Sequence, residues 1–310
     1  MIFVFSENPD VELELLTKGR ELAEKAGTEL STLSFSEDGA NDLIKYGADV
    51  AFLTEKPPEF YSEVYTDLIA SLAEKYDLDT ILIGGTKRGK ETAPRIATRL
   101  EVGSAPDCFD LDIEDGGLIV KRRVYSGNSV ATEKYEKKPQ VATVPPMTFE
   151  KAEKDESRTG KIEKFEFTAK PVGKSIKGLK EKSKEGIKIE DAIYVVSGGR
   201  GVKAKGDFSL ISQLAEAIGG EVGCSRPIAS DLKWLSEDHW VGLSGHKVKP
   251  KIYIACGISG QVQHLAGMRD SGTIVAINKN SDAPIFKVAD YGIVGDLYKV
   301  VPKLAELLKK

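Results

Sequence analysis

The stretch Ile252-Tyr253-Ile254-Ala255-Cys256-Gly257-Ile258-Ser259-Gly260 decides the fold of the carboxyl-terminal half of the chain. A short apolar run with strand character leads into a turn that contains two glycines, and the pattern predicts that a helix begins at Ser259-Gly260. The first backbone N–H groups of a helix have no partner inside it and lie at the positive end of its dipole, so they favour an anion. The stretch therefore predicts a strand, a glycine turn that phosphates can approach, and a helix.

Two further strands follow this stretch, and both end in polar residues or glycine. Thr273–Ile277 ends on Asn278, and Tyr291–Val294 ends on Gly295-Asp296 before a last amphipathic helix. Ligands of parallel α/β sheets bind at the carboxyl ends of the strands. The spacing therefore predicts a nucleotide-like ligand without saying which one.

Upstream, two more predicted strands end next to an arginine. Ala192–Ser197 leads into Gly198-Gly199-Arg200-Gly201, where glycines permit a close approach of a phosphate and a guanidinium can pair with its oxygens. Glu221–Gly223 leads into Cys224-Ser225-Arg226-Pro227. A residue before proline favours an extended backbone, so the second arginine is expected to project from its loop. Taken singly, an arginine of this kind more often forms a surface ion pair.

Several segments of this half resemble the electron transfer flavoprotein alpha subunit family, in the family's order and with almost no gaps. They are Val195–Gly201, Val222–Pro227, Gly257–Gly260, Gln263–Met268, Val275–Lys279, Ala283–Phe286 and Ala289–Gly292. The resemblance is strong from about residue 190 to the end and weak before it.

This resemblance implies an α/β fold with two domains. Residues 1–186 would form a nucleotide-hydrolase-like domain whose own nucleotide site is not used, and residues 187–310 a Rossmann-like, parallel-sheet FAD-binding domain. It also implies a heterodimer with an electron transfer flavoprotein beta subunit, which is where the family's AMP lies. Such a protein is an electron carrier, which takes electrons from acyl-CoA or other dehydrogenases and delivers them to an acceptor such as a membrane quinone oxidoreductase.

The resemblance assigns the FAD site to the strand ends and to the loop after residue 240. The residues are Arg200, Ser225, Arg226, Val241, Gly242, Leu243, Ser244, Ser259, Gly260, Gln261, Val262, Gln263, His264, Asn278, Asp296 and Leu297. It implies pyrophosphate contacts from residues 259–263, Arg226 near the isoalloxazine, and a hydrogen bond from His264 to the O2 edge of the flavin.

The segment Trp240–Gly245 departs from the family, which most often reads V-G-Q-T-G here. Ser244 keeps a hydroxyl that can interact with flavin N5. Leu243 replaces a glutamine and cannot make an amide's hydrogen bonds, which implies a flavin whose potential or exposure differs from that in relatives.

Composition and charge exclude other classes of protein. A chain of 310 residues suits two domains, and a formal net charge of −4 does not indicate nucleic-acid binding. The three cysteines form no C-x-x-C pair, which argues for a reducing compartment and against a structural zinc site. His264 lacks a nucleophile or ligand pattern around it. No leader or apolar run of bilayer length is apparent, so we expect a cytoplasmic protein without membrane insertion.

Strands also alternate with helices in the amino-terminal half, which predicts parallel βαβ units. The expected strands are Ile2–Phe5, Ser31–Phe35, Val50–Leu53, Thr80–Ile83 and Gln140–Val144. The expected helices are Val11–Ala26, Tyr61–Tyr76 and a third that ends near Leu100. A hairpin is expected in which Ser126-Gly127-Asn128 joins the strands Leu118–Tyr125 and Ser129–Lys134. We expect the Val141–Val144 run to be a sheet edge that a partner covers.

Three alternatives stay open from the sequence. Gly84–Lys90 is a phosphate-binding turn or a plain turn without Walker spacing. Lys151–Glu190, rich in lysine and glutamate, is a charged linker or a patch that docks an acidic redox partner. For function, a free-standing nicotinamide- or flavin-dependent oxidoreductase is the alternative, although the chain lacks G-x-G-x-x-G and an obvious substrate acid or base. A scaffold protein without a cofactor is a third possible function, beside the electron carrier and the oxidoreductase.

Overall fold

The computed structural model describes residues 1–127, 129–178 and 189–309. These residues form two compact units, Met1–Lys177 and Gly178–Lys310. The boundary expected between residues 186 and 187 falls within 179–188, outside the described residues. Each unit contains a parallel sheet with helices, so the predicted α/β class with two domains is confirmed.

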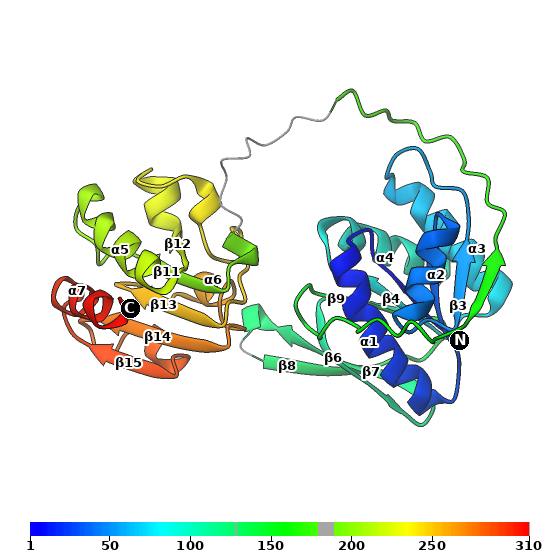
Figure 1. Ribbon diagram of the computed structural model, residues 1–310, viewed down its shortest axis with the longest axis horizontal. Coiled ribbons are helices and arrows are strands. Elements are labelled where there is room, and N and C mark those ends of the chain that lie inside the picture. The colour runs from blue at the N-terminus through cyan, green and yellow to red at the C-terminus, as the bar shows by residue number, and fades with distance from the viewer. Residues whose placement is uncertain (128, 179–188, 310) are drawn as a thin grey trace. The chain divides into compact units, whose positions relative to one another are not determined.

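The first unit is built on a seven-stranded parallel sheet in the order β10-β3-β2-β1-β4-β9-β5 (Figure 1). Its strands are β1 (Ile2–Phe5), β2 (Leu30–Ser34), β3 (Val50–Leu53), β4 (Thr80–Gly84), β5 (Ser104–Ala105), β9 (Gln140–Val144) and β10 (Lys161–Lys164), and its helices are α1 (Pro9–Ala26), α2 (Glu37–Lys45), α3 (Ser62–Tyr76) and α4 (Lys87–Arg99). Helix α1 begins where Asn8 accepts from the Asp10 N–H, and it ends at Gly27, whose φ of 63° closes the last turn.

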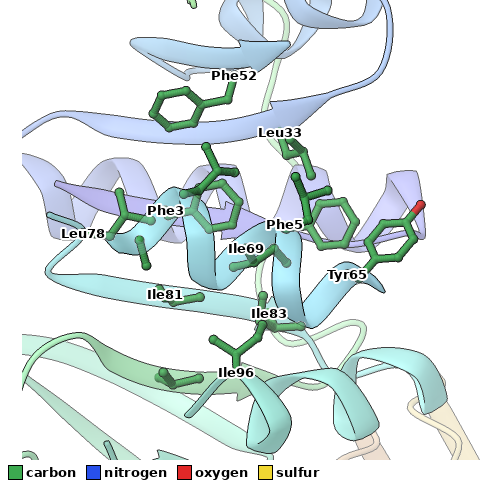
Figure 2. Packing of buried hydrophobic residues seen from close by; sticks show 14 of the residues in the cluster. Phe3, Phe5, Leu33, Phe52, Tyr65, Ile69, Leu78, Ile81, Ile83 and Ile96 are labelled. Carbon is green, nitrogen blue, oxygen red and sulfur yellow. The ribbon is translucent and has the colours of Figure 1, made fainter. Parts of the chain in front are cut away.

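The core of this unit lies on both faces of the sheet, because its central strands are buried throughout. On one face Phe3 and Phe5 of β1 pack with Ile69 and Tyr65 of α3, as Figure 2 shows. On the other face Val4 packs with residues of α1 such as Leu15 and Leu16. Two covered faces explain why the strands read as continuous apolar runs.

One prediction about this sheet is wrong. Gln140–Val144 is no edge strand, since β9 lies between β4 and β5 and all five of its residues are buried. Within the charged segment Lys151–Glu190, residues Lys161–Lys164 form the edge strand β10, which pairs in parallel with β3 from Lys161↔Val50 to Lys164↔Leu53. Its polar sequence hides it, because an edge strand can keep charged side chains in water.

A small antiparallel sheet completes the first unit, with β6 (Cys108–Glu114), β7 (Gly117–Val124) and β8 (Ser129–Lys134). The predicted pairing of β7 with β8 is confirmed, although Asn128 of its turn lies outside the described residues. In the Gly84–Lys90 turn, Thr86 caps α4 by accepting from the Gly89 N–H and donates to the Glu7 carboxylate at 2.6 Å.

The second unit holds a five-stranded parallel sheet in the order β12-β11-β13-β14-β15. Its elements are β11 (Tyr194–Gly198), β12 (Glu221–Cys224), β13 (Ile252–Cys256), β14 (Thr273–Asn278), β15 (Tyr291–Val294), α5 (Phe208–Ile218), α6 (Val262–Leu265) and α7 (Leu297–Leu308). Residues of α5 and α7 cover one face, and Leu265 and Met268 belong to the core on the other. This order runs second-first-third-fourth-fifth along the chain, and such sheets bind ligands where the first and third strands diverge.

No helix among the described residues is both long and apolar enough to cross a membrane.

Candidate functional site

A cavity of about 670 Å³ lies in the second unit at the carboxyl ends of its parallel strands. Residues within two positions of the ends of β11, β12, β13, β14 and β15 all contribute to its lining. It thus occupies the place that the strand order favours, between the exits of β11 and β13. Its volume is within the range of small-molecule and cofactor sites, ~300–1,000 Å³.

The structure brings nearly all predicted site residues together around this cavity. Those that line it are Arg200, Ser225, Arg226, Val241, Gly242, Leu243, Ser244, Ser259, Gly260, Gln261, Gln263, His264, Asn278, Asp296 and Leu297. Val262 does not line it: this side chain lies on α6 and is exposed.

Several lining residues were missed by the sequence reasoning. They include Lys203, Trp240, Ile258, Ile277, Lys279 and Tyr298. Lys279 directly follows Asn278, so its position after a strand end was a usable signal. Tyr298 had no such signal, because it reaches the cavity from the first turn of α7.

The glycine turn after β13 differs from the prediction in its length. Helix α6 begins at Val262, not at Ser259-Gly260, and it has only four residues. A single turn has too few aligned peptides for a strong dipole. Instead, residues 257–261 form an open loop, and within the described part of the chain the N–H groups of Ser259, Gly260 and Gln261 donate to no protein acceptor. These three N–H groups are therefore available to an anion.

Arg226 also differs from the prediction, because it is not extended. Its φ of −43° and ψ of −49° are helical, and it begins the helical turn Pro227–Asp231. The preference of a residue before proline for extended backbone is overridden by a turn around Arg226 and Pro227, which the Ile228 N–H closes by donating to the Ser225 carbonyl at 3.0 Å. The guanidinium carbon lies 6.0 Å from the centroid of the Trp240 ring, within the range of cation–π attraction.

The charged side chains that line the cavity are mostly positive. They are Arg200, Lys203, Arg226 and Lys279, and in the described lining they face one carboxylate, that of Asp296. This carboxylate caps α7 by accepting from the Tyr298 N–H at 3.0 Å. The lining therefore suits a ligand with more than one negative charge, such as a pyrophosphate.

Asn278 joins two of the strand exits. Its side-chain amide donates to the Ile258 carbonyl at 2.8 Å, and its oxygen accepts from the Asn280 N–H at 2.9 Å. Much of the hydrogen-bonding capacity of this amide thus serves the loop that follows β13. Leu297 is buried in the core beneath the cavity.

The loop after Trp240 is held against α6 by its backbone. The Leu243 N–H donates to the Gln263 carbonyl at 2.7 Å. A Cβ on Gly267 would lie 2.5 Å from the Gly242 Cα, so glycine is needed at this contact. The side chains of Leu243 and Ser244 are exposed at the cavity, which leaves both free to face a ligand.

His264 is the most enclosed polar side chain of the site, with 7% of its surface exposed. Its Nε2 lies 3.0 Å from the Tyr253 hydroxyl, whereas its Nδ1 is buried and has no hydrogen-bond partner among the described residues. Burial lowers the pKa of the imidazole to about 4, and the Val241 backbone acts against this to a smaller extent. The ring is therefore neutral at pH 7, and its unpaired nitrogen fits a polar ligand atom in the cavity.

Comparison with known proteins identifies the family. Residues 5–170 match the electron transfer flavoprotein domain, and residues 188–269 match the electron transfer flavoprotein FAD-binding domain. The electron transfer flavoprotein subunit alpha of Thermoanaerobacterium thermosaccharolyticum is 43% identical over 100% of this chain and 98% of its own length. Protein FixB of Clostridium saccharobutylicum is 39% identical over 100% of this chain and 96% of its own length. The subunit alpha of Bacillus subtilis is 39% identical over 87% and 84%, respectively. The chain therefore belongs to the family of electron transfer flavoprotein alpha subunits.

Proposed function

We propose that this chain holds FAD in the cavity of its second unit, pairs with an electron transfer flavoprotein beta subunit, and carries electrons from dehydrogenases to an acceptor. The observation that carries this proposal is the combination, in one cavity, of free backbone donors, a positive lining and the unpaired Nδ1 of His264. The match of residues 188–269 to the family's FAD-binding domain supports it.

The residues of the cavity divide by chemistry into two groups. The N–H groups of Ser259, Gly260 and Gln261, with the nearby cations, suit the pyrophosphate of FAD. Arg226 and His264 carry donors that suit the polar edge of the isoalloxazine. FAD, when bound, supplies the reversible uptake of electrons, and the protein supplies binding, orientation and electrostatics.

The chemistry of the site favours a carrier over an enzyme that transforms its own substrate. Asp296 is the one carboxylate in the described lining, and it already caps α7. Cys224 and Cys256 are buried, and burial raises the pKa of each thiol to about 12, which makes them poor nucleophiles. Among the described residues, the neutral His264 has no nucleophile hydrogen-bonded to it other than a buried phenol. These features support electron transfer through a bound cofactor.

The identity of the donors, a quinone oxidoreductase as acceptor and a cytoplasmic location stay predictions from the sequence. Co-expression of the chain with a beta subunit tests the central proposal. We expect a yellow complex of one chain of each kind, with flavin absorbance bands and FAD in the extract. A colourless complex would indicate a scaffold, and reduction of the isolated chain by a nicotinamide nucleotide would indicate the free-standing oxidoreductase.

A further inference from the structure

The side chains of Tyr253 and His264 meet beneath the cavity, although they come from different elements. Tyr253 is the second residue of β13 and is fully buried, and His264 lies on α6. The phenol oxygen is 3.0 Å from His264 Nε2, and the ring centroids are 6.1 Å apart. A buried phenol normally satisfies its hydroxyl with a hydrogen bond. In the described structure that bond goes to the imidazole.

The direction of this hydrogen bond decides which imidazole nitrogen carries the proton. Because burial keeps His264 neutral, the ring has one N–H and one acceptor nitrogen. If Tyr253 donates to Nε2, the N–H must lie on Nδ1. The reverse direction would send the phenol hydrogen towards Ser197. The Ser197 hydroxyl lies close enough to lower the pKa of the Tyr253 phenol, but it makes no hydrogen bond of normal geometry. The phenol hydrogen therefore has a better acceptor in Nε2, and we favour donation to this nitrogen.

The other nitrogen of His264 is the one that a ligand would use. Nδ1 is buried, and it makes no hydrogen bond of normal geometry with a described residue, although the Val241 backbone lies close enough to the ring to raise its pKa slightly. The His264 side chain lines the cavity. A buried N–H without an acceptor is unfavourable, so an Nδ1–H group here favours a ligand that brings an acceptor oxygen to it. The tautomer thus determines whether the residue recognises an acceptor or a donor.

We propose that Tyr253 is a positioning residue that holds His264 as the Nδ1–H tautomer, so that His264 donates from Nδ1 to an acceptor oxygen of the bound ligand. This inference rests on the proposed function, under which the oxygen is a carbonyl of the flavin. It adds to that function the residue that orients the donor and the nitrogen that donates.

Nitrogen NMR of the full-length chain in complex with its beta subunit tests the proposal, because the shifts of the two ring nitrogens report which one is protonated. The chain has only three histidines, so labelling with 15N-histidine gives few signals. We expect the Nδ1–H pattern for His264 at pH 7, with FAD bound and after its removal. In FAD-depleted Tyr253→Phe this single pattern should be lost, because no donor then holds Nε2 as the acceptor.

The chain offers internal controls for this measurement. His239 Nδ1 lies 2.6 Å from the Val222 carbonyl and His246 Nδ1 lies 2.6 Å from the Glu190 carboxylate, so their signals should not respond to Tyr253→Phe. Tyr194→Phe, in the neighbouring strand β11, removes a hydroxyl from the same sheet and should leave all three histidines unchanged.

An Nε2–H pattern for His264 in the unaltered protein would overturn the inference, and this holds even if Tyr253→Phe does not fold. An unchanged Nδ1–H pattern in FAD-depleted Tyr253→Phe would overturn it as well. The FAD content, read from absorbance, separates this failure from that of the proposed function. FAD bound beside an Nε2–H imidazole contradicts only the inference, and an Nδ1–H imidazole in a protein that binds no FAD contradicts only the function.

Discussion

Gly201 and Gly257 hold two of the strand exits in direct backbone contact. The Gly201 N–H donates to the Gly257 carbonyl at 2.9 Å, and a Cβ on Gly201 would lie 2.6 Å from the Gly257 Cα. The glycines after β11 are therefore required by the contact with the turn after β13, whether or not a phosphate also approaches them. Because both glycines line the cavity, this contact fixes the backbone on that side of the cavity.

We expect Gly257→Ala to destabilise the chain more than Gly27→Ala and to lower its FAD content. Gly257 and Gly27 have nearly the same φ, 64° and 63°, so an alanine in the left-handed conformation should cost about 1–2 kcal/mol at either position. Only Gly257 is also crowded, since its Cβ would lie 2.8 Å from the Gly201 Cα while nothing lies within 4 Å at Gly27. Urea unfolding of the two variants measures the difference, and equal losses would show that the crowding is relieved at no cost.

Replacement of Arg226 by alanine should lower the reduction potential of the bound flavin. A guanidinium near a flavin favours its reduced, anionic form, and a hydrogen bond to a charged group contributes ~1.5–3 kcal/mol. With ~59 mV per ~1.4 kcal/mol for a one-electron couple, the expected decrease is on the order of 60–130 mV. Spectroelectrochemical titration measures it.

Two variants serve as controls for this prediction. Arg226→Lys keeps the charge, so its flavin potential should fall by less than that of Arg226→Ala. Lys287→Ala removes a cation that does not line the cavity, so its flavin potential should equal that of the unaltered protein. A decrease below about 20 mV in Arg226→Ala would correspond to an exposed ion pair, worth ~0–1 kcal/mol.

The Leu243→Gln variant should raise the flavin potential without a large change in stability. Leu243 lines the cavity and its side chain is 47% exposed, so the exchange creates no hole in the core. A neutral hydrogen bond from the new amide contributes ~0.5–1.5 kcal/mol, which corresponds to an increase on the order of 20–65 mV for a one-electron couple. The same titration reads the change, and an unaltered potential would show that the amide does not reach the flavin.

Acidification should reduce the stability of the protein through His264. Its pKa is about 4 in the folded chain, against an ordinary value near 6.5, because burial disfavours the charged ring. Between these values the unfolded state binds a proton that the folded state does not. The free energy of unfolding should therefore be unaffected by His264 above about pH 6.5. It should fall by about 3 kcal/mol as the pH drops to about 4.

His264→Gln removes this group and should flatten the dependence of the unfolding free energy on pH. His239→Gln, which changes a half-buried histidine outside the cavity, should retain the full slope because His264 remains. Urea midpoints at several pH values with a fixed excess of FAD provide the measurement. Equal slopes in the unaltered protein and His264→Gln would mean that the imidazole has the same pKa in the folded and unfolded states.

Much of the architecture was predictable from local sequence. The alternation of apolar strands with helices indicated parallel sheets in both halves, and the glycine or polar residues after β11, β13, β14 and β15 indicated one edge of the second sheet as the site. These features depend on residues close together in the chain. The position of β9 was not predictable in this way, because its place between β4 and β5 depends on strands far away in the sequence.

The sequence by itself determined the fold class, through hydrophobic periodicity, and indicated the family and the segments that surround the cavity, through short motifs that resemble those of the family. Only the tertiary structure decided that Arg226 turns into a helical bend near Trp240, that α6 begins at Val262, and that Tyr253 meets His264 beneath the cavity. Each of these outcomes balances a local preference against contacts with other elements. The local preference can be estimated from the propensities of neighbouring residues. The contacts depend on how residues far apart in the sequence pack together, which the sequence does not show directly.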